Sequence, residues 1–397
     1  MAAGKVGAPL TEILAGDVPV FLVHKGVQNA KRLGEVFGAL GTLHGDTLGI
    51  GTIARLPNER SNIVERYLKG HRNVPLRLAD PELHRAPGSG WEGAGPLTGY
   101  AAKWEYLATV PDRPKNRWVR SVLKAQADHG ASALLSASGW VSEVEATKSL
   151  ARAMTFVSES REIAEDRPMF ASLTLDGRWL SDPGLRGKLL HEMVESPEKN
   201  WYLRFYWPEI QVRYGQLTDP AILEGYKELA TTAAVEDRTL LLPGTGLTGW
   251  VASALGATGF STGTSWGEQA FSKPRVMGGR KGMRPPPRVP RYFDWALLHT
   301  VEYQEYLRLR ELDGHEDYES PFSLELETHG HAHDLNGLHY LMAAAALQAE
   351  LNARRPSVVA LRRVRSAKSF LDGLRRLDQP SGQNRPQHLD AWEDLLS

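Results

Sequence analysis

Eight short apolar segments alternate with segments of helical periodicity along residues 18–263. A regular succession of strand and helix is typical of a parallel α/β sheet, and eight such units in roughly 250 residues have the size of a closed (β/α)8 barrel. An open doubly wound sheet is the alternative, and the number of units favours the barrel. The predicted strands are VPVFLV (18–23), TLGIGTI (47–53), VPLRLA (74–79), SALLSAS (132–138), MFASLTL (169–175), WYLRFYW (201–207), TLLLPG (239–244) and TGFSTG (258–263).

The chain divides into three predicted parts: an α/β barrel over 1–272, a basic linker rich in Pro and Gly over 273–291, and a helical C-terminal region over 292–397 that packs on the barrel. Within the barrel, residues 84–107 mix Gly, Pro and aromatic residues, a composition typical of a long functional loop or a lid on the catalytic face.

Lys plus Arg and Asp plus Glu each number 47, so any basic binding surface must be local. The basic linker and the Arg-rich stretch 351–377 are candidates for contacting phosphates, and a solvated helix face is the alternative for the latter. The absence of cysteine excludes disulfides, thiolate catalysis and Cys-ligated zinc. With neither a leader nor a long apolar stretch, we expect a cytoplasmic protein with no membrane partner.

In a barrel the active site lies at the C-terminal ends of the strands, where several polar residues occur in this sequence. Asp80 is a candidate general base or nucleophile, although an Asp before Pro also starts turns. Arg204 lies in an aromatic strand and needs a partner if it is buried. Further candidates are Ser136, Asp176, Glu209, Ser261 and the turn Gly244, Thr245, Gly246, which either binds phosphate or only forms a tight turn.

Residues 327–342, ETHGHAHDLNGLHYLM, are rich in histidine. Without cysteine, a zinc site here has only Asp294, His299, His331 and His333 as ligands. The alternative is the entry to a helix, with Asp334 or Asn336 as the cap.

The stretch His333-Asp334-Leu335, followed by Leu341-Met342, resembles the segment of tRNA-guanine transglycosylases in which a zinc-binding His precedes Asn-Leu and a helix that contains Leu-Met. LADPELHR (78–85) is similar to the end of that family's third strand. This resemblance places Asp80 on the catalytic Asp, His84 on a base-stacking aromatic residue and Arg85 on a Gln. It also places Asp176 on the base-reading Gln.

Several positions depart from the family pattern. Ser261 falls where the family has its nucleophilic Asp, and a serine needs an adjacent base to act as a nucleophile. Trp207-Pro208-Glu209 replaces a Gly-Gly pair, and the three zinc cysteines are absent. We therefore expect no cofactor, with zinc as the one candidate.

The resemblance implies a base-exchange transglycosylase acting on guanine or 7-deazaguanine in nucleic acid, with DNA favoured over tRNA. Asp80 would be the principal carboxylate, His84 would stack on the base and Asp176 would read its edge. If Ser261 occupies the nucleophile position, Asp80 or Glu209 must take over that role, or the reaction differs. One alternative is a non-catalytic nucleic-acid-binding paralogue or subunit. Another is a small-molecule barrel enzyme that binds a phosphorylated metabolite. Whether the chain forms a homodimer or joins a partner subunit stays open.

Overall fold

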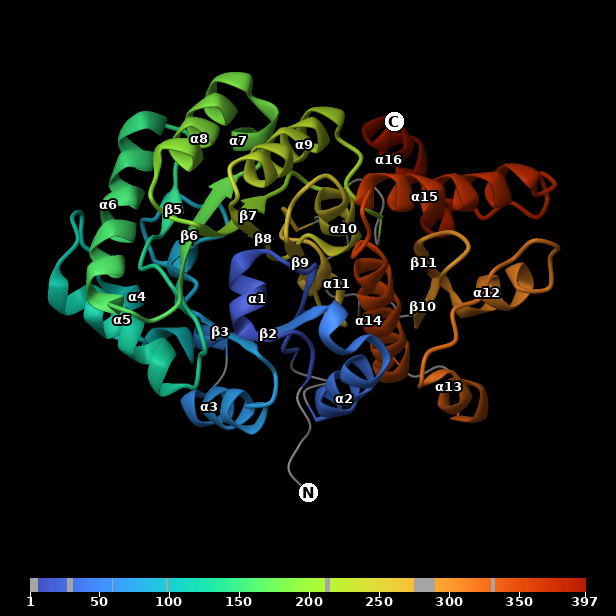
Figure 1. Ribbon diagram of the computed structural model, residues 1–397, viewed down its shortest axis with the longest axis horizontal. Helices are drawn as coiled ribbons and strands as arrows, with labels where there is room; N and C mark the ends of the chain where they lie inside the picture. Colours follow the sequence, from blue (N-terminus) through green and yellow to red (C-terminus); the bar gives the residue numbers. More distant parts are fainter. Residues whose placement is uncertain are drawn as a thin grey trace, which may run out of the picture.

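The computed structural model describes residues 6–26, 31–58, 60–97, 99–210, 215–274, 290–329 and 333–397, and the side chains of Trp266 and His333 are not among what it describes. Its main sheet is parallel and curves into a nearly closed barrel surrounded by helices (Figure 1). This confirms the predicted (β/α)8 barrel. Hydrogen-bonded strands follow in the order β3-β2-β1-β9-β8-β7-β6-β4, and β5 pairs with the end of β6.

The eight barrel strands coincide with the eight predicted apolar segments. They are β1 (Val20–His24), β2 (Gly49–Arg55), β3 (Leu76–Asp80), β4 (Leu134–Leu135), β6 (Met169–Asp176), β7 (Asn200–Tyr206), β8 (Thr239–Leu242) and β9 (Gly259–Thr262). The additional strand β5 (Trp140–Val141) is short.

Single hydrogen bonds rather than a ladder join β3 to the chain that leads into β4. The Ser132 N–H donates to the Arg77 carbonyl at 2.9 Å, and the Arg77 N–H donates to Ser132 Oγ at 2.8 Å. Arg77 Nε also donates to the Gly130 carbonyl at 3.1 Å, and Ser132 Oγ donates to the Pro75 carbonyl at 2.7 Å, so side chains as well as backbone join β3 to the segment before β4.

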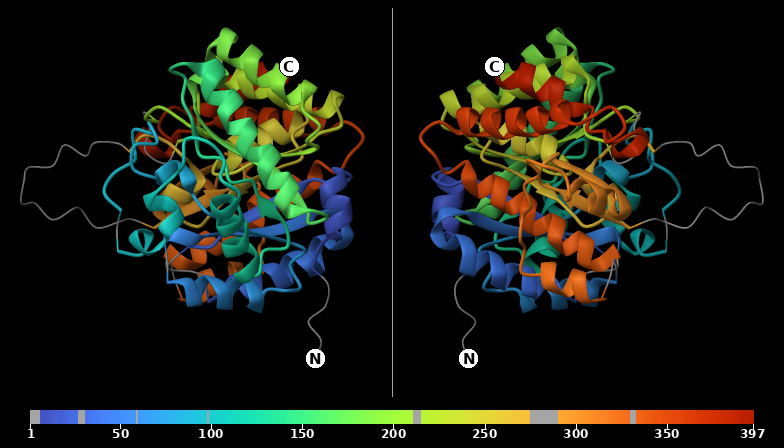
Figure 2. Two further views of the ribbon diagram at one scale, coloured as in Figure 1. Left: turned by 90° about the vertical axis from the view of Figure 1, so that its left-hand side faces the viewer. Right: turned by 90° about the vertical axis from the view of Figure 1, so that its right-hand side faces the viewer.

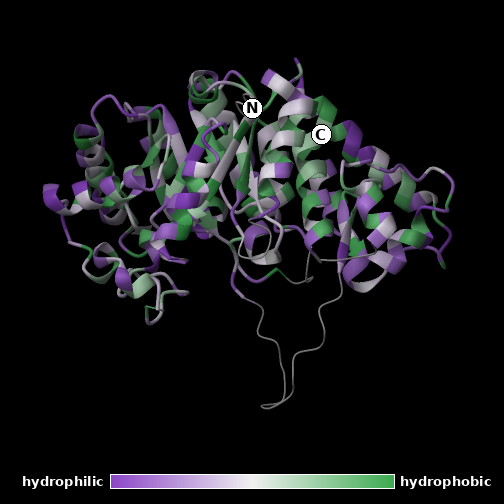
Figure 3. Ribbon diagram, turned by 90° about the horizontal axis from the view of Figure 1, so that it is seen from below, coloured by the Kyte–Doolittle hydropathy of each residue, from purple (hydrophilic) through white to green (hydrophobic). Residues whose placement is uncertain are grey.

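Side chains of the strands alternate between two apolar clusters, as the period of two in a β-strand requires. Leu22, Leu78 and Tyr202 belong to the smaller cluster, which lies inside the barrel. Ile13 of α1 (Leu10–Ala15) belongs to the same cluster. Neighbouring strand residues such as Val23 belong to the larger cluster under the helices. Figure 3 shows the hydrophobic residues concentrated on the central strands.

Helices of the outer ring cover the strands. They are α2 (Leu33–His44), α3 (Ser61–Gly70), α4 (Glu105–Ala108), α5 (Asn116–Asp128), α6 (Ala146–Ala164), α7 (Arg178–Ser181), α8 (Pro183–Glu195), α9 (Pro220–Val235), α10 (Gly246–Ala254) and α11 (Trp266–Gln269). Short 3-10 turns occur at η1 (Gly45–Thr47), η2 (Leu56–Asn58), η3 (Leu83–Arg85) and η4 (Ala101–Lys103). Both α8 and α9 begin with an Asp-Pro pair, in which Asp182 or Asp219 caps the first free N–H groups.

The C-terminal region contains a hairpin and five helices. They are β10 (Arg291–Asp294), β11 (His299–Glu302), α12 (Tyr303–Leu309), α13 (Ser323–His329), α14 (His333–Glu350), α15 (Pro356–Gly373) and α16 (His388–Leu396), with η5 (Gly382–Asn384) before α16. α15 packs on α10, and α16 packs on α9 (Figure 2).

Helix α14 completes the outer ring, because it contacts α2, α10 and β1. Tyr340 bonds to Thr262 of β9 at 2.9 Å, and the Trp250 indole of α10 donates to the Leu347 carbonyl at 3.0 Å. Residues Leu338 to Ala345 of α14 are buried, and this burial explains why α14 is apolar on nearly all sides. The eighth helix of the barrel therefore lies beyond a long insertion after β9. No helix in the described residues is long and apolar enough to span a bilayer.

Candidate functional site

Alternation along the strands places polar side chains in the top layer of the barrel interior. Leu22, Leu78 and Tyr202 lie in the interior apolar cluster. The next inward-facing positions, two residues further along, are His24, Asp80 and Arg204, and each is 5% exposed or less. Three strands thus carry buried ionisable groups at or near their C-terminal ends, the face where barrel enzymes have their sites.

Asp80 and Arg204 form a buried ion pair, and the guanidinium donates directly to Asp80 Oδ2. The Tyr202 hydroxyl donates to the same oxygen at 3.2 Å, while Oδ1 accepts the Glu82 N–H at 2.8 Å. Burial works to lower the pKa of Arg204, but Asp80, Tyr202 and Glu82 more than offset it, so the pKa is raised. Asp80 is therefore both the turn-starting Asp and the partner that Arg204 requires.

Glu82 extends this charged layer toward the rim. It has a left-handed backbone with φ of 46°, which is costly for a side chain larger than glycine. Its Oε2 accepts from Arg85 at 2.9 Å, and its Oε1 lies 3.9 Å from Arg55 Nε. The strained turn after β3 thus holds a second carboxylate between two guanidinium groups.

His24 lies beside β9. His24 Nε2 is 2.8 Å from Ser261 Oγ. The Gly244 N–H donates to the same Ser261 oxygen at 2.7 Å. Burial, together with Arg55 and Arg204, holds the pKa of His24 well below its usual value. The imidazole is therefore neutral at pH 7.

Aromatic rings form one wall of the mouth. The Trp91 ring lies 4.8 Å from His84 and 5.5 Å from Phe271, measured between ring centroids. Arg204 donates to His84 Nδ1 at 3.4 Å. Burial, followed by the neighbouring Arg204, lowers the pKa of His84. The His84 ring meets Trp91 and Phe271 edge-to-face, at interplanar angles of 73° and 74°, while Trp91 and Phe271 are tilted by 33°.

Glu268, on α11 after β9, is the third carboxylate of the mouth and is only 7% exposed. Burial raises its pKa, and the Ser265 N–H donates to Oε2 at 3.1 Å. A Cβ on Gly263 would lie 2.4 Å from Glu268, so this glycine allows the carboxyl group to reach its position.

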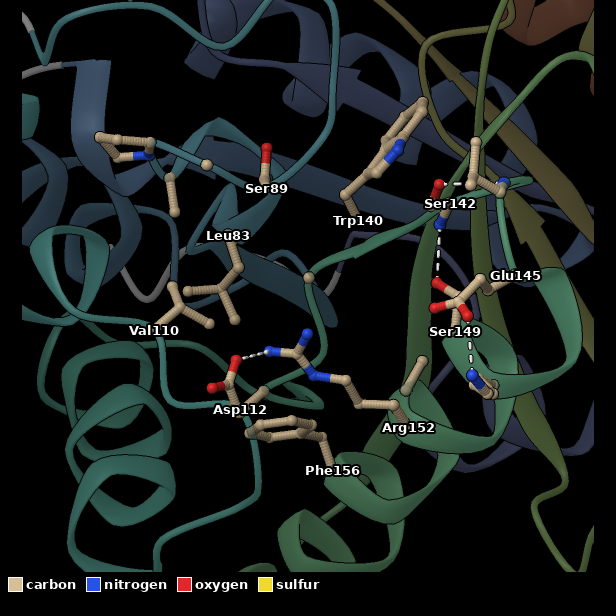
Figure 4. A pocket seen from close by; sticks show the side chains of 18 residues that line it. Leu83, Ser89, Val110, Asp112, Trp140, Ser142, Glu145, Ser149, Arg152 and Phe156 are labelled. Carbon is tan, nitrogen blue, oxygen red and sulfur yellow. Dashed lines mark hydrogen bonds and ion pairs between the residues drawn. The ribbon is translucent and has the colours of Figure 1, made fainter.

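These groups surround a cavity of about 320 Å³ at the C-terminal ends of the strands, whose lining includes His24, Arg55, Glu82, His84, Trp91 and Glu268. A second cavity of about 350 Å³ lies between the segment after β3 and helix α6. Although it is slightly larger, its ionic groups are exposed and paired. Arg152 lies 3.5 Å from Asp112 on the opposite side (Figure 4), and Lys148 lies 2.7 Å from Glu145, three residues earlier at the start of α6.

Residues 83–91 separate the two cavities, because Leu83 and Ser89 line the outer one whereas His84 and Trp91 line the mouth. The mouth is the candidate site, since among the cavities lined by described residues it gathers buried ionisable groups from several barrel strands.

No protein-family model and no curated protein matches this chain.

The structure brings some of the sequence-predicted residues together. His84, Arg85, Arg204 and Gly244 line the mouth, and Asp80 lies against Arg204. Ser261 adjoins the cavity through His24 and is fully buried.

Other predicted residues lie outside the mouth lining. Ser136 Oγ accepts the Ser172 N–H between β4 and β6, and Asp176 Oδ1 accepts the Arg178 N–H at the start of α7. Glu209 is exposed after β7.

The 244–246 turn uses its polar groups internally. Besides the Gly244 bond to Ser261, the Thr245 hydroxyl donates to the Leu242 carbonyl at 2.8 Å. A Cβ on Gly246 would lie 2.6 Å from the Gln269 carbonyl oxygen. These contacts account for the turn without a phosphate.

The predicted metal ligands have protein partners. Asp294 Oδ2 lies 3.1 Å from His315 Nε2, and His299 Nε2 lies 3.0 Å from the Gln383 carbonyl. The His333 side chain and all of His331 fall outside the described residues. Among the residues that are described, no group of three or more His, Asp or Glu could hold a metal ion.

The two predicted basic surfaces are the linker 273–291 and the Arg-rich stretch 351–377, which includes helix α15. Most of the linker, 275–289, lies outside the described residues. On α15, Arg363 pairs with Glu350, Arg365 with Glu393, and Lys368 with both Asp390 and Glu393.

Sequence reasoning did not single out several mouth residues, among them His24, Arg55, Glu268 and Phe271. His24 and Arg55 are the last residues of β1 and β2, so a search of every strand end would have found them. Glu268 lies in a short helix after β9, and nothing in its local sequence distinguishes it from a surface carboxylate.

Proposed function

We propose that this barrel binds a purine-type base of a nucleic acid in its mouth and breaks or exchanges the glycosidic bond of that base. The observation that carries the proposal is a cavity lined by two buried carboxylates, Glu82 and Glu268, and by aromatic rings, with Asp80 held against Arg204 next to it. Glycosidic chemistry needs a negative charge close to the sugar carbon, an acid for the leaving base and a surface for the base.

The aromatic wall suits the base. Trp91, Phe271 and His84 offer ring surfaces at the cavity, and stacking on aromatic side chains is a general way to hold an extruded base. The lowered pKa of His84 keeps this ring uncharged, so it stacks without placing a cation against the base.

The carboxylates suit different roles. The raised pKa of Glu268 fits a general acid that protonates the departing base. Asp80, fixed by Arg204, Tyr202 and the Glu82 N–H, supplies a positioned negative charge for an oxocarbenium-like transition state. Ser261 has an adjacent imidazole in His24, but its complete burial favours a positioning role over attack on the sugar.

The test is exchange of radiolabelled guanine into duplex DNA and into tRNA. We expect incorporation with the wild-type chain and a strong loss with Glu268→Gln and Asp80→Asn. Asp166→Asn, which changes an exposed carboxylate on the loop before β6, is the matched control. Full exchange by both mouth variants would refute the proposed roles.

Salt-dependent DNA binding without any exchange would instead favour a non-catalytic binding subunit. The phosphorylated-metabolite alternative receives no support from the Gly244 N–H or the Thr245 hydroxyl, because both are bonded within the protein.

A further inference from the structure

We infer that His24 is a specificity-determining residue of the mouth, whose Nδ1–H, oriented by Ser261, donates to an acceptor atom on the edge of the bound ring. The identity of the ring rests on the proposed function. The orientation of the imidazole does not.

The tautomer follows from the hydrogen bonds of Ser261. Its Oγ already accepts the Gly244 N–H at 2.7 Å, and among the described residues its other hydrogen-bond partner is His24 Nε2 at 2.8 Å. The hydroxyl proton therefore points to Nε2. A neutral imidazole whose Nε2 accepts a hydrogen bond carries its proton on Nδ1.

That Nδ1–H has no acceptor within the described residues, although His24 is only 5% exposed. Buried donors almost always have a partner, so an unpaired one on a cavity wall indicates a missing ligand atom. The Trp91 indole N–H, on the same cavity, is also buried without a partner.

The remaining lining indicates which kind of atom fits. Arg55 and Arg85 add further N–H donors to this lining, which also carries the carboxylates of Glu82 and Glu268. Since His24 lies below the rim, only a group that inserts into the cavity reaches it. A flat ring with a carbonyl oxygen or an unprotonated ring nitrogen on its edge meets both conditions, and a phosphate oxygen is the other source of the same acceptor chemistry.

The tautomer can be measured without a ligand, by nitrogen-15 NMR of histidine-labelled full-length protein, with His24 assigned by comparison with His24→Gln. We expect a protonated Nδ1 and an unprotonated Nε2 in the wild type. Ser261→Ala should abolish this fixed preference. An Nε2-protonated His24 in the wild type would overturn the inference.

Binding of guanine, 2-aminopurine and inorganic phosphate then identifies the acceptor. Guanine should shift the Nδ1 resonance and bind roughly tenfold more weakly to His24→Gln, which keeps a group near Ser261 but loses the donor at the Nδ1 position. His24→Asn, which places an amide N–H near the Nδ1 position, should recover part of this affinity. 2-Aminopurine lacks the 6-oxygen, so a similar loss with both bases assigns the acceptor to a ring nitrogen, and a loss with guanine alone assigns it to the oxygen.

The failures are distinguishable. Guanine binding that is equal in the wild type and in a folded His24→Gln protein overturns the role of His24 alone. An equal Nδ1 shift with phosphate assigns the acceptor to a phosphate oxygen and overturns the ring acceptor. A wild-type chain that binds no purine overturns the proposed function and, with it, the ring acceptor assigned to His24. Thermal unfolding of each variant confirms that it is folded.

Discussion

The barrel mouth and the C-terminal hairpin region both bury histidine and aspartate, yet they use them differently. In the mouth, Asp80 and His84 bond to the side chain of Arg204 beside an open cavity. Around the hairpin, His299 and His388 bond to the carbonyls of Gln383 and Leu298 and fasten the hairpin to the chain that leads into α16. Burial alone therefore does not mark a functional group. Both regions contain an ionic side-chain pair, Asp80 with Arg204 and Asp294 with His315, and a buried imidazole nitrogen without a partner among the described residues. The mouth differs in that its groups lie at a cavity at the C-terminal ends of the barrel strands.

The largest expected effect is a loss of stability, which should be greater for a substitution in the mouth than for one in the hairpin region. Asp80→Asn leaves the Arg204 charge buried without its counter-ion, which should lower the free energy of unfolding by about 3–5 kcal/mol. Asp294→Asn should cost less, because its partner His315 can lose its proton whereas a guanidinium cannot. Urea unfolding of both variants measures the difference, and equal losses would break the contrast. The double variant Asp80→Asn/Arg204→Met should recover part of the loss.

The second effect concerns catalysis. Removing a general acid usually costs a factor of about 10²–10⁴, so Glu268→Gln should lower base exchange by at least roughly a hundredfold with little change in KM. Because burial raises the pKa of Glu268, the acid stays protonated to a higher pH than an exposed glutamate, and activity should fall as pH rises through that pKa. A pH profile with the same alkaline limb in Glu268→Gln would assign the acid elsewhere.

The third effect is a pH dependence in the hairpin region. Burial lowers the pKa of His299 from 6.5 to about 4, so between these values the unfolded chain binds a proton that the folded chain does not. Stability from this group is present above pH 6.5 and is lost as pH falls toward 4, by about 1.4 kcal/mol per pH unit. In His299→Gln the stability should depend less steeply on pH in this window, measured by urea unfolding at pH 7, 6 and 5. His329→Gln, an exposed change, is the control and should keep the wild-type slope.

The fourth effect tests the aromatic wall. Loss of one stacking surface typically costs about 1–3 kcal/mol, so Trp91→Ala should weaken guanine binding by roughly tenfold or more. Fluorescence titration or calorimetry gives the affinity. Unchanged binding in a folded variant would remove Trp91 from the site.

The smallest effect compares the two cavities. Lys148 lies in the outer cavity in an exposed pair with Glu145, and such pairs contribute about 1 kcal/mol or less. Lys148→Ala should leave exchange within about twofold of the wild type. A loss as large as that of Trp91→Ala would make the outer cavity part of the site.

The sequence predicted the strands of the barrel more completely than it predicted the residues of the site. The eight apolar segments predicted the eight barrel strands, because strands buried on both faces are nearly continuous in hydrophobic residues. Arg204 was predicted to need a partner, and Asp80 is that partner although 124 residues separate them. The sequence did not indicate that α14 completes the outer ring of barrel helices. The insertion after β9 places α14 within residues 292–397, which the sequence pattern separates from the barrel by a basic linker.

The sequence by itself determined the parallel barrel, through the spacing of its apolar segments, and placed Asp80, His84 and Arg204 at strand ends. Only the tertiary structure decided that His24, Arg55 and Glu268 join them. Each is a single polar residue on a separate element, and its local pattern is that of an ordinary strand end or surface helix. Closure of the sheet brings these elements to one face, where burial and neighbouring charges give the side chains their protonation states.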